Sequence, residues 1–218
     1  MPRQTFFNLP PAKQRNIVYA ALAEFAKKGY EIGNVGMIAK QANVSKGSMY
    51  QYFEDKEEFY LYLAGYAYSM IKTALRSELQ LLETQKADLQ VVVKEMRRIL
   101  WNLLEQYPME LSFLFSTKGE HEESVVSSLK RLCEAFYQQT LQPMLEHALC
   151  EGQIRDDIPM EYLLLYCQGI QGMLQKKLQV YIVYNREENH VGITIEKEVW
   201  NQIYDTIATM MLTGLIKD

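Results

Sequence analysis

The sequence predicts an all-α protein of about nine helices, with a small domain over residues 1–55 and a larger helical domain over residues 56–218. Apolar residues recur at helical spacing along almost the whole chain, and no strand-like alternation lasts long enough to build a sheet. The 218 residues are 48% hydrophobic, which is enough for a sizeable core. No run of about 18 uncharged apolar residues and no short apolar leader occur, so we expect a cytoplasmic chain with no membrane partner.

Charge is distributed unevenly between the two expected domains. Residues 1–56 carry eight Lys/Arg against four acidic residues, a balance of +4, whereas residues 57–218 carry 15 basic and 23 acidic residues, a balance of −8. A basic head on an acidic body is expected when only the head meets phosphate, although chance clustering on a solvated face gives the same totals.

Two helices are expected near the N-terminus. The first spans roughly 11–28, since proline at position 11 suits the first helical turn, and Gly29 stops it. The second spans about 35–41 and follows Asn34, a good N-cap residue.

A tight turn and a third short helix follow. Asn43 breaks the second helix because asparagine tolerates the left-handed conformation that such a turn requires. Ser45 then caps a helix over about 46–52, with Met49 and Phe53 four residues apart on its buried side. Two helices joined by a turn of this length form a helix-turn-helix, whose second helix enters the DNA major groove.

The larger domain is expected to contain six more helical segments. They span roughly 56–82, 88–106, 108–119, 122–150, 160–184 and 195–216. The last two are apolar on more than one face, so we expect one face in the core and the other in a homodimer seam; burial of both faces inside a monomer is the alternative.

The segment Ile32–Lys56 carries the most informative motif. Lys46, Gly47, Ser48, Tyr50 and Gln51 are expected to project from the third helix, where they are short or polar enough to approach base edges and phosphates. The amide of Gln51 suits adenine and the amine of Lys46 suits guanine.

A stretch of 49 residues, 12–60, resembles the N-terminal domain of the TetR family of bacterial repressors. The hallmark is a Val-Ser-Lys-Gly-(Ser/Thr)-hydrophobic-Tyr-x-Tyr-Phe run followed by Lys-Glu. In this chain it stands as Val44-Ser45-Lys46-Gly47-Ser48-Met49-Tyr50-Gln51-Tyr52-Phe53, and then Lys56-Glu57.

The resemblance implies a role for each matched position. Ser48 and Tyr50 would touch DNA, Gln51 and Lys46 would set specificity, and Tyr52 would anchor phosphate.

Two further positions are implied by the same resemblance. Lys56 would anchor phosphate at the start of the fourth helix. The family often has Thr or Ser near the start of helix two, where it contacts phosphate. Gly33 and Asn34 stand there in this chain: Asn34 replaces the cap and is the expected DNA-binding residue, whereas Gly33 brings no hydroxyl.

The resemblance also implies a repressor that binds a quasi-palindromic operator in double-stranded DNA as a homodimer and is released by a small-molecule effector. We expect that effector to be mainly apolar. Met and aromatic residues at helical spacing are its candidate contacts, with plain core packing as the alternative. These candidates are Phe59, Tyr66, Met70, Trp101, Phe113, Phe136 and Met173.

The sequence shows no catalytic or metal-binding pattern. His121, His147 and His190 lie far apart, and none stands in a metal-ligand spacing. His147 and Cys150 share a helix face, but no second ligand pair accompanies them, so a packed or exposed histidine is the better interpretation. We therefore expect no enzyme, no metal and no cofactor. The three cysteines are expected to be small buried hydrophobes.

A second function class remains open. A helical small-molecule sensor could use its basic head to bind a protein partner in place of DNA. Absence of salt-dependent duplex affinity would favour that alternative.

Overall fold

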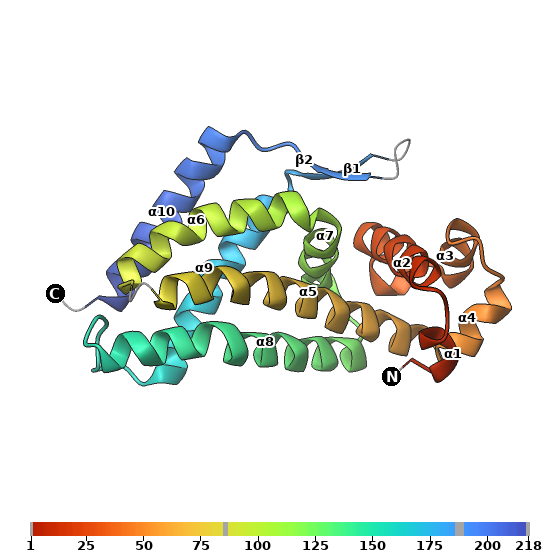
Figure 1. Ribbon diagram of the computed structural model, residues 1–218, viewed down its shortest axis with the longest axis horizontal. Helices are drawn as coiled ribbons and strands as arrows, with labels where there is room; N and C mark the ends of the chain where they lie inside the picture. Colours follow the sequence, from red (N-terminus) through yellow and green to blue (C-terminus); the bar gives the residue numbers. More distant parts are fainter. Residues whose placement is uncertain (1, 85–86, 186–189, 217–218) are drawn as a thin grey trace. The chain divides into compact units, whose positions relative to one another are not determined.

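The computed structural model describes residues 2–84, 87–185 and 190–216 (Figure 1). Within these residues it contains ten α-helices, one short 3₁₀ helix and two strands. Contacts divide the described chain into two compact units: unit 1 holds residues 2–70 and 109–134, and unit 2 holds residues 71–108, 135–185 and 191–216. The mainly helical fold expected from the sequence is confirmed, while a domain boundary between residues 55 and 56 stays a prediction.

Unit 1 contains the predicted helix-turn-helix and one helix that the sequence did not predict. Its elements are α1 (Gln4–Phe7), α2 (Pro11–Ile32), α3 (Val35–Gln41), α4 (Lys46–Tyr52), the first part of α5 (Lys56–Thr84), most of α7 (Pro108–Ser116), η1 (Thr117–Gly119) and the first part of α8 (Glu123–Cys150). Gly29 interrupts α2 with φ of 70°, and helical structure then resumes as far as Ile32. The expected stop at Gly29 is therefore a kink.

Aromatic rings fill the centre of unit 1. Phe25 contacts Tyr60 edge-on, with the ring centroids 5.0 Å apart, and Tyr60 contacts Phe113 at 5.1 Å. Phe59 lies 4.2 Å from Phe53. All five side chains are at most 2% exposed. Edge-to-face pairs of this kind add to the stability from burial, which makes these rings the core that supports α2 to α5.

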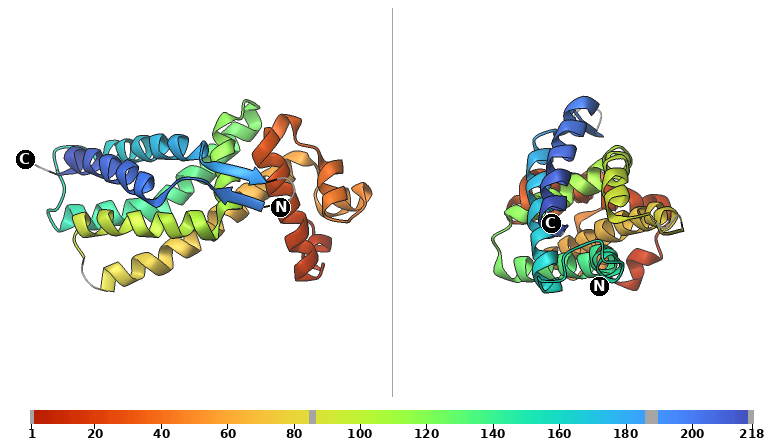
Figure 2. Two further views of the ribbon diagram at one scale, coloured as in Figure 1. Left: turned by 90° about the horizontal axis from the view of Figure 1, so that it is seen from above. Right: turned by 90° about the vertical axis from the view of Figure 1, so that its left-hand side faces the viewer.

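Unit 2 consists of the second part of α5, α6 (Leu89–Gln106), the second part of α8, α9 (Met160–Gln179) and α10 (Lys197–Leu215), together with strands β1 (Ile182–Asn185) and β2 (His190–Ile193). The two strands run in opposite directions and form a two-stranded sheet (Figure 2). This corrects two expectations, that no sheet would form and that the helix beginning near residue 160 would continue to 184. Helix α9 ends at Gln179, and Thr194 N donates to Tyr181 O at 2.9 Å.

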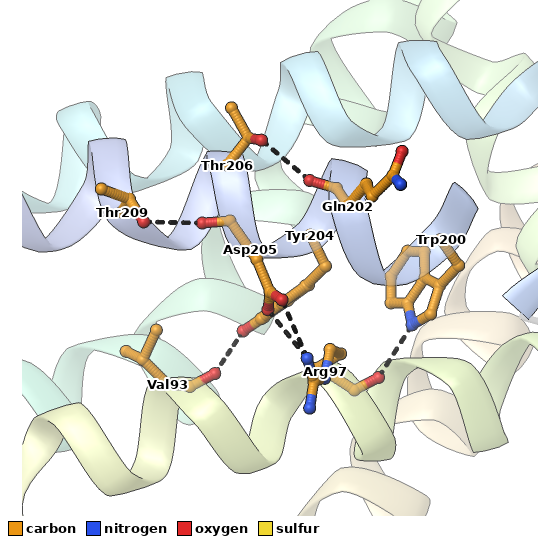
Figure 3. Close-up of polar contacts among 8 residues, drawn as sticks. All are labelled: Val93, Arg97, Trp200, Gln202, Tyr204, Asp205, Thr206 and Thr209. Atoms are coloured by element: carbon orange, nitrogen blue, oxygen red, sulfur yellow. Dashed lines mark hydrogen bonds and ion pairs between the residues drawn. The ribbon is translucent and has the colours of Figure 1, made fainter. Parts of the chain in front are cut away.

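Side-chain donors fix α10 against α6 within unit 2 (Figure 3). Trp200 Nε1 donates to Arg97 O at 3.2 Å, and Tyr204 Oη donates to Val93 O at 2.6 Å. Arg97 also pairs with Asp205, with Nη1 and Oδ2 2.9 Å apart. Trp200 and Tyr204 are buried, so these bonds satisfy polar atoms that would otherwise lie unpaired in the core.

The cysteines differ in burial, which corrects a further expectation. Cys167 is buried, Cys133 is half-buried and Cys150 is exposed. Among the helices of the described residues, none is both long enough and apolar enough to cross a membrane.

Candidate nucleic-acid interface

Helices α3 and α4 are joined by a turn whose geometry depends on one asparagine. Asn43 adopts φ of 53°, in the left-handed region, as expected from the sequence. Val44 N then donates to Ala39 O at 2.9 Å, which closes the turn back onto α3. Ala39 is 1% exposed, so the small side chain lies where the two helices meet. The local chain chemistry thus builds the helix-turn-helix.

Each of these two short helices begins at a side-chain cap. Asn34 Oδ1 accepts from the backbone N–H groups of Gly36 at 2.8 Å and Met37 at 3.2 Å. Ser45 Oγ accepts from Ser48 N at 3.0 Å. Caps of this kind stabilise a helix by about 1 kcal/mol, a large share for helices of seven residues.

Helix α4 has one buried face and one exposed face. Met49 and Tyr52 are buried, at 1% and 7% exposure. Four of the residues predicted to contact DNA lie on the exposed face: Lys46, Gly47, Tyr50 and Gln51. Ser48 is half-buried, and its Oγ lies 2.8 Å from Ser45 Oγ. The structure thus brings five predicted contact residues together on one short helix, while the ring of Tyr52 packs towards the core.

Gly33, which stands where the TetR family often has Thr or Ser, has no room for a side chain. A Cβ at Gly33 would lie 2.4 Å from Phe25 Cδ1 and 2.7 Å from Gly29 O. Since Phe25 is fully buried, neither atom has free space to move into. Glycine at this position is therefore explained by the close approach of the backbone to Phe25, and Asn34 alone supplies the polar group at the start of α3.

Lys56 is held at the start of α5 by contacts to the end of α2. Its Nζ donates to Glu31 O at 2.9 Å and lies 4.9 Å from the centroid of the Tyr30 ring. Burial lowers the pKa of the Lys56 amine, and the charges of Glu120 and Glu31 oppose that shift. The predicted phosphate anchor is thus also a cap for the last carbonyls of α2.

Glu120, which follows η1, links α2 to α5 inside unit 1. Its Oε1 accepts from Tyr60 Oη at 2.6 Å and from Tyr30 N at 2.8 Å. Burial, together with this hydrogen bond and the charge of Glu120, raises the pKa of Tyr60 far above its ordinary value. The carboxylate also lies beside the kink, because a Cβ at Gly29 would be 3.2 Å from Oε1. The sequence pattern did not predict these contacts, because Glu120 lies 60 residues from Tyr60 and 90 residues from Tyr30.

The predicted effector contacts fall in several places. Phe59 and Phe113 are buried in the core of unit 1, and Met173 is 51% exposed on α9. Tyr66 and Met70 lie partly buried on the first part of α5, and Trp101 lies partly buried on α6, 6.2 Å from Trp200. Of the seven, Phe136 lines a cavity of unit 2.

Unit 2 contains two adjoining cavities. One has a volume of about 120 Å³ and is lined almost wholly by apolar side chains of α5, α6, α8, α9 and α10. The other, of about 370 Å³, is lined by residues of α5, α6, α8 and their loops. Leu79, Leu89 and Met144 line both, so the two spaces adjoin. An apolar interior of this kind is typical of small-molecule sites.

Comparison with known proteins finds a family match for the N-terminal region of the chain. Residues 17–63, which run from α2 into α5, match the family described as "Bacterial regulatory proteins, tetR family". The N-terminal region of the chain, with its helix-turn-helix, is thus similar to the DNA-binding region of the TetR family. The matched residues include the whole helix-turn-helix and the run that carried the resemblance in the sequence.

Two curated relatives of the chain are named as regulators. Over 63 residues it is 40% identical to the "Uncharacterized HTH-type transcriptional regulator YuxN" of Bacillus subtilis, covering 29% of the chain and 22% of that protein. Over 145 residues it is 26% identical to the "HTH-type transcriptional repressor NicS" of Pseudomonas putida, covering 66% of each. The chain thus spans less than two thirds of the length of either relative.

The fold extends over the whole chain. A crystal structure of the transcriptional regulator FadR from Bacillus subtilis in complex with stearoyl-CoA aligns with a TM-score of 0.71 and 16% identity, covering 92% of this chain and 98% of FadR. The larger helical part of the chain, which offered no sequence motif, therefore has the fold of a solved regulator.

Proposed function

We propose that the chain is a homodimeric transcriptional repressor that binds a quasi-palindromic DNA operator through α4 and is released by a small, mainly apolar effector. The observation that carries the proposal is the exposed face of α4, with Lys46, Tyr50 and Gln51 projecting from a helix capped for that conformation. The family match of the N-terminal region supports the same activity. In a dimer, the two copies of α4 would lie in successive major grooves, about 34–36 Å apart.

Dimerisation is proposed through the last two helices. The exposed side of α9 carries three large apolar side chains, Tyr162, Leu165 and Met173, and Val180 follows directly after the helix; these four side chains are 51–70% exposed. Met210 on α10 is 50% exposed. Apolar side chains repeated along one helix face favour a helix partner, and in a self-complementary seam that partner is a second copy of the chain.

The cavities of unit 2 are the proposed effector site. Two hydroxyls on the wall of the smaller cavity are already bonded inside the protein, since Tyr204 Oη donates to Val93 O and Thr140 Oγ1 donates to Phe136 O. Neither set of described lining residues includes an acidic side chain. An apolar ligand is therefore favoured over a cation. The fold shared with FadR, solved with stearoyl-CoA, supports an effector with a long acyl chain.

Selection of duplexes from a random pool with the purified protein, at two salt concentrations, tests the proposal. We expect recovery of a two-fold-symmetric site. Tyr50→Ala should abolish binding to that site, because the side chain is 46% exposed on the reading helix. Tyr19→Ala is the matched control, since it removes a tyrosine of similar exposure, 43%, from α2. Stearoyl-CoA should then release the selected duplex.

Three outcomes would contradict parts of the proposal. Weak, sequence-independent binding that vanishes with salt would favour the alternative in which the head binds a protein. Retention of specific binding by Tyr50→Ala would show that α4 is not the reading element. Failure of stearoyl-CoA to release the duplex would refute the acyl chain and leave the DNA-binding assignment intact.

A further inference from the structure

The C-terminal end of α4 is held by a segment far away in the sequence. Like any helix, α4 leaves its last carbonyl groups without donors from its own backbone, and in a helix of seven residues these make up a large share of the total. The last bond of the ladder is Phe53 N to Met49 O at 2.9 Å. The carbonyls of the next three residues need donors from elsewhere.

Two residues near the N-terminus supply those donors, from the segment that leads into α1; helix α1 itself packs against α4 (Figure 1). Arg3 Nη1 donates to Tyr50 O at 3.3 Å, and Arg3 N donates to Tyr52 O at 2.8 Å. Between them, Thr5 Oγ1 donates to Gln51 O at 2.5 Å. The three consecutive carbonyls at the end of α4 therefore each have a partner from residues 3–5.

A buried ring fixes this segment in place. Phe6 is 0% exposed, and its ring lies 5.0 Å from Phe53 and 5.5 Å from Tyr62. The segment continues into α1, and the side chain of Gln14 on α2 donates to Leu9 O at 2.8 Å. Residues 3–6 are thus anchored in the core of unit 1 by Phe6, while the polar groups of Arg3 and Thr5 bond α4.

We propose that residues 3–6 form a clamp on the C-terminal end of α4, and that Arg3 and Thr5 are positioning residues for DNA recognition. The proposal rests on the proposed function, since it concerns how α4 reads DNA. Tyr50 and Gln51, two of the expected contacts, belong to the turn whose carbonyls the clamp occupies. The last turn of a short helix frays when its carbonyls lack donors, and a positive charge there also complements the helix dipole.

The clamp gives Arg3 a different role from a direct phosphate contact. A guanidinium that bonds Tyr50 O acts through the helix, so its loss should weaken specific binding and leave non-specific binding unchanged. A guanidinium that bonds phosphate acts on every sequence alike and adds about one unit to the salt slope. One salt titration of duplex affinity, with a specific and a non-specific duplex, therefore distinguishes the two roles of Arg3.

Thr5→Val in the full-length protein is the direct test, because valine keeps the shape of threonine and removes only the donor. We expect the amides of Gln51–Phe53 to exchange hydrogen about fivefold faster, the effect of one neutral hydrogen bond. Affinity for the duplex selected by the wild type should fall by a similar factor, with unchanged affinity for a scrambled duplex and an unchanged salt slope. Thr5→Ser should restore both values.

Gln4→Ala is the matched control. The Gln4 side chain bonds Asn8 within the same segment at 3.1 Å, so its removal should leave exchange in α4 unchanged. Equal exchange in Thr5→Val and the wild type would overturn the clamp. A salt slope lowered by about one unit in Arg3→Gln, with exchange in α4 unchanged, would overturn it in favour of a phosphate contact. A wild type that selects no duplex refutes the DNA-binding proposal instead.

Discussion

Removing the Glu120 carboxylate should weaken unit 1 by more than a surface substitution would. Glu120→Ala deletes the acceptor of two hydrogen bonds, from Tyr60 Oη at 2.6 Å and from Tyr30 N at 2.8 Å. A hydrogen bond to a charged group contributes about 1.5–3 kcal/mol, and the Tyr60 hydroxyl, on a residue that is 0% exposed, would be left unpaired. We expect the free energy of unfolding to fall by about 3 kcal/mol.

A double-mutant cycle isolates the bond between the two side chains. Tyr60→Phe alone should lower the free energy of unfolding by about 1.5 kcal/mol, and the double variant should lose about 1.5 kcal/mol less than the two single variants together. Urea denaturation followed by circular dichroism, at one fixed protein concentration, measures all four proteins. Glu122→Ala, an exposed neighbour, is the control and should change stability by less than about 0.5 kcal/mol.

Additive losses of unfolding free energy in Glu120→Ala and Tyr60→Phe would refute the proposed coupling between the two side chains. If the two single losses add to within about 0.5 kcal/mol, the carboxylate and the hydroxyl are not coupled, and the joint between α2 and α5 does not depend on their contact.

Three further predictions concern packing, pH and assembly. Gly33→Ala should cost about 1–3 kcal/mol of stability because its Cβ meets the Phe25 ring, whereas Gly65→Ala, with open space around it, should cost nothing. Burial raises the pKa of Glu110, so the folded state binds its proton more readily than the unfolded chain does, and stability falls as pH rises past the ordinary carboxyl value. Glu110→Gln should therefore be the more stable protein in thermal unfolding at pH 8, with an advantage that vanishes in acid. Leu165→Lys should convert the dimer to a monomer in sedimentation velocity, and an unchanged dimer would exclude α9 from the seam.

Local chemistry explains why the helix-turn-helix could be predicted so closely. The bounds of α3 and α4 agree with the expected ranges, since Asn34, Asn43 and Ser45 act on residues no more than four positions away. The prediction that α9 continues to residue 184 was wrong for a local reason as well. Val180, Tyr181 and Ile182 continue the apolar run but favour strand over helix, and in the structure the first two form the turn after α9 while Ile182 begins β1.

Contacts between distant segments had no sequence signal. Thr5 bonds a carbonyl 46 residues away, and Glu120 bonds Tyr60 at a separation of 60. The same holds for the cavity walls, because helical spacing shows which residues share a face but not which neighbouring helix that face meets. Of the seven predicted effector contacts, Phe136 was consequently the one among the described residues that line the two cavities of unit 2.

In α4, the residues that stabilise the helix differ from the residues on its exposed face, and this separation has an evolutionary consequence. The conformation of α4 depends on the cap from Ser45 at its N-terminal end, on the clamp of residues 3–6 at its C-terminal end and on the buried side chain of Met49. None of these residues belongs to its exposed face, where the predicted DNA contacts lie. Even at Gly47 an added Cβ would meet only Ser45 Oγ, at an ordinary 3.8 Å. Substitutions on the exposed side can therefore accumulate without unfolding unit 1. Under the proposed function, duplicated copies of such a gene could acquire new operator preferences while the scaffold stays the same.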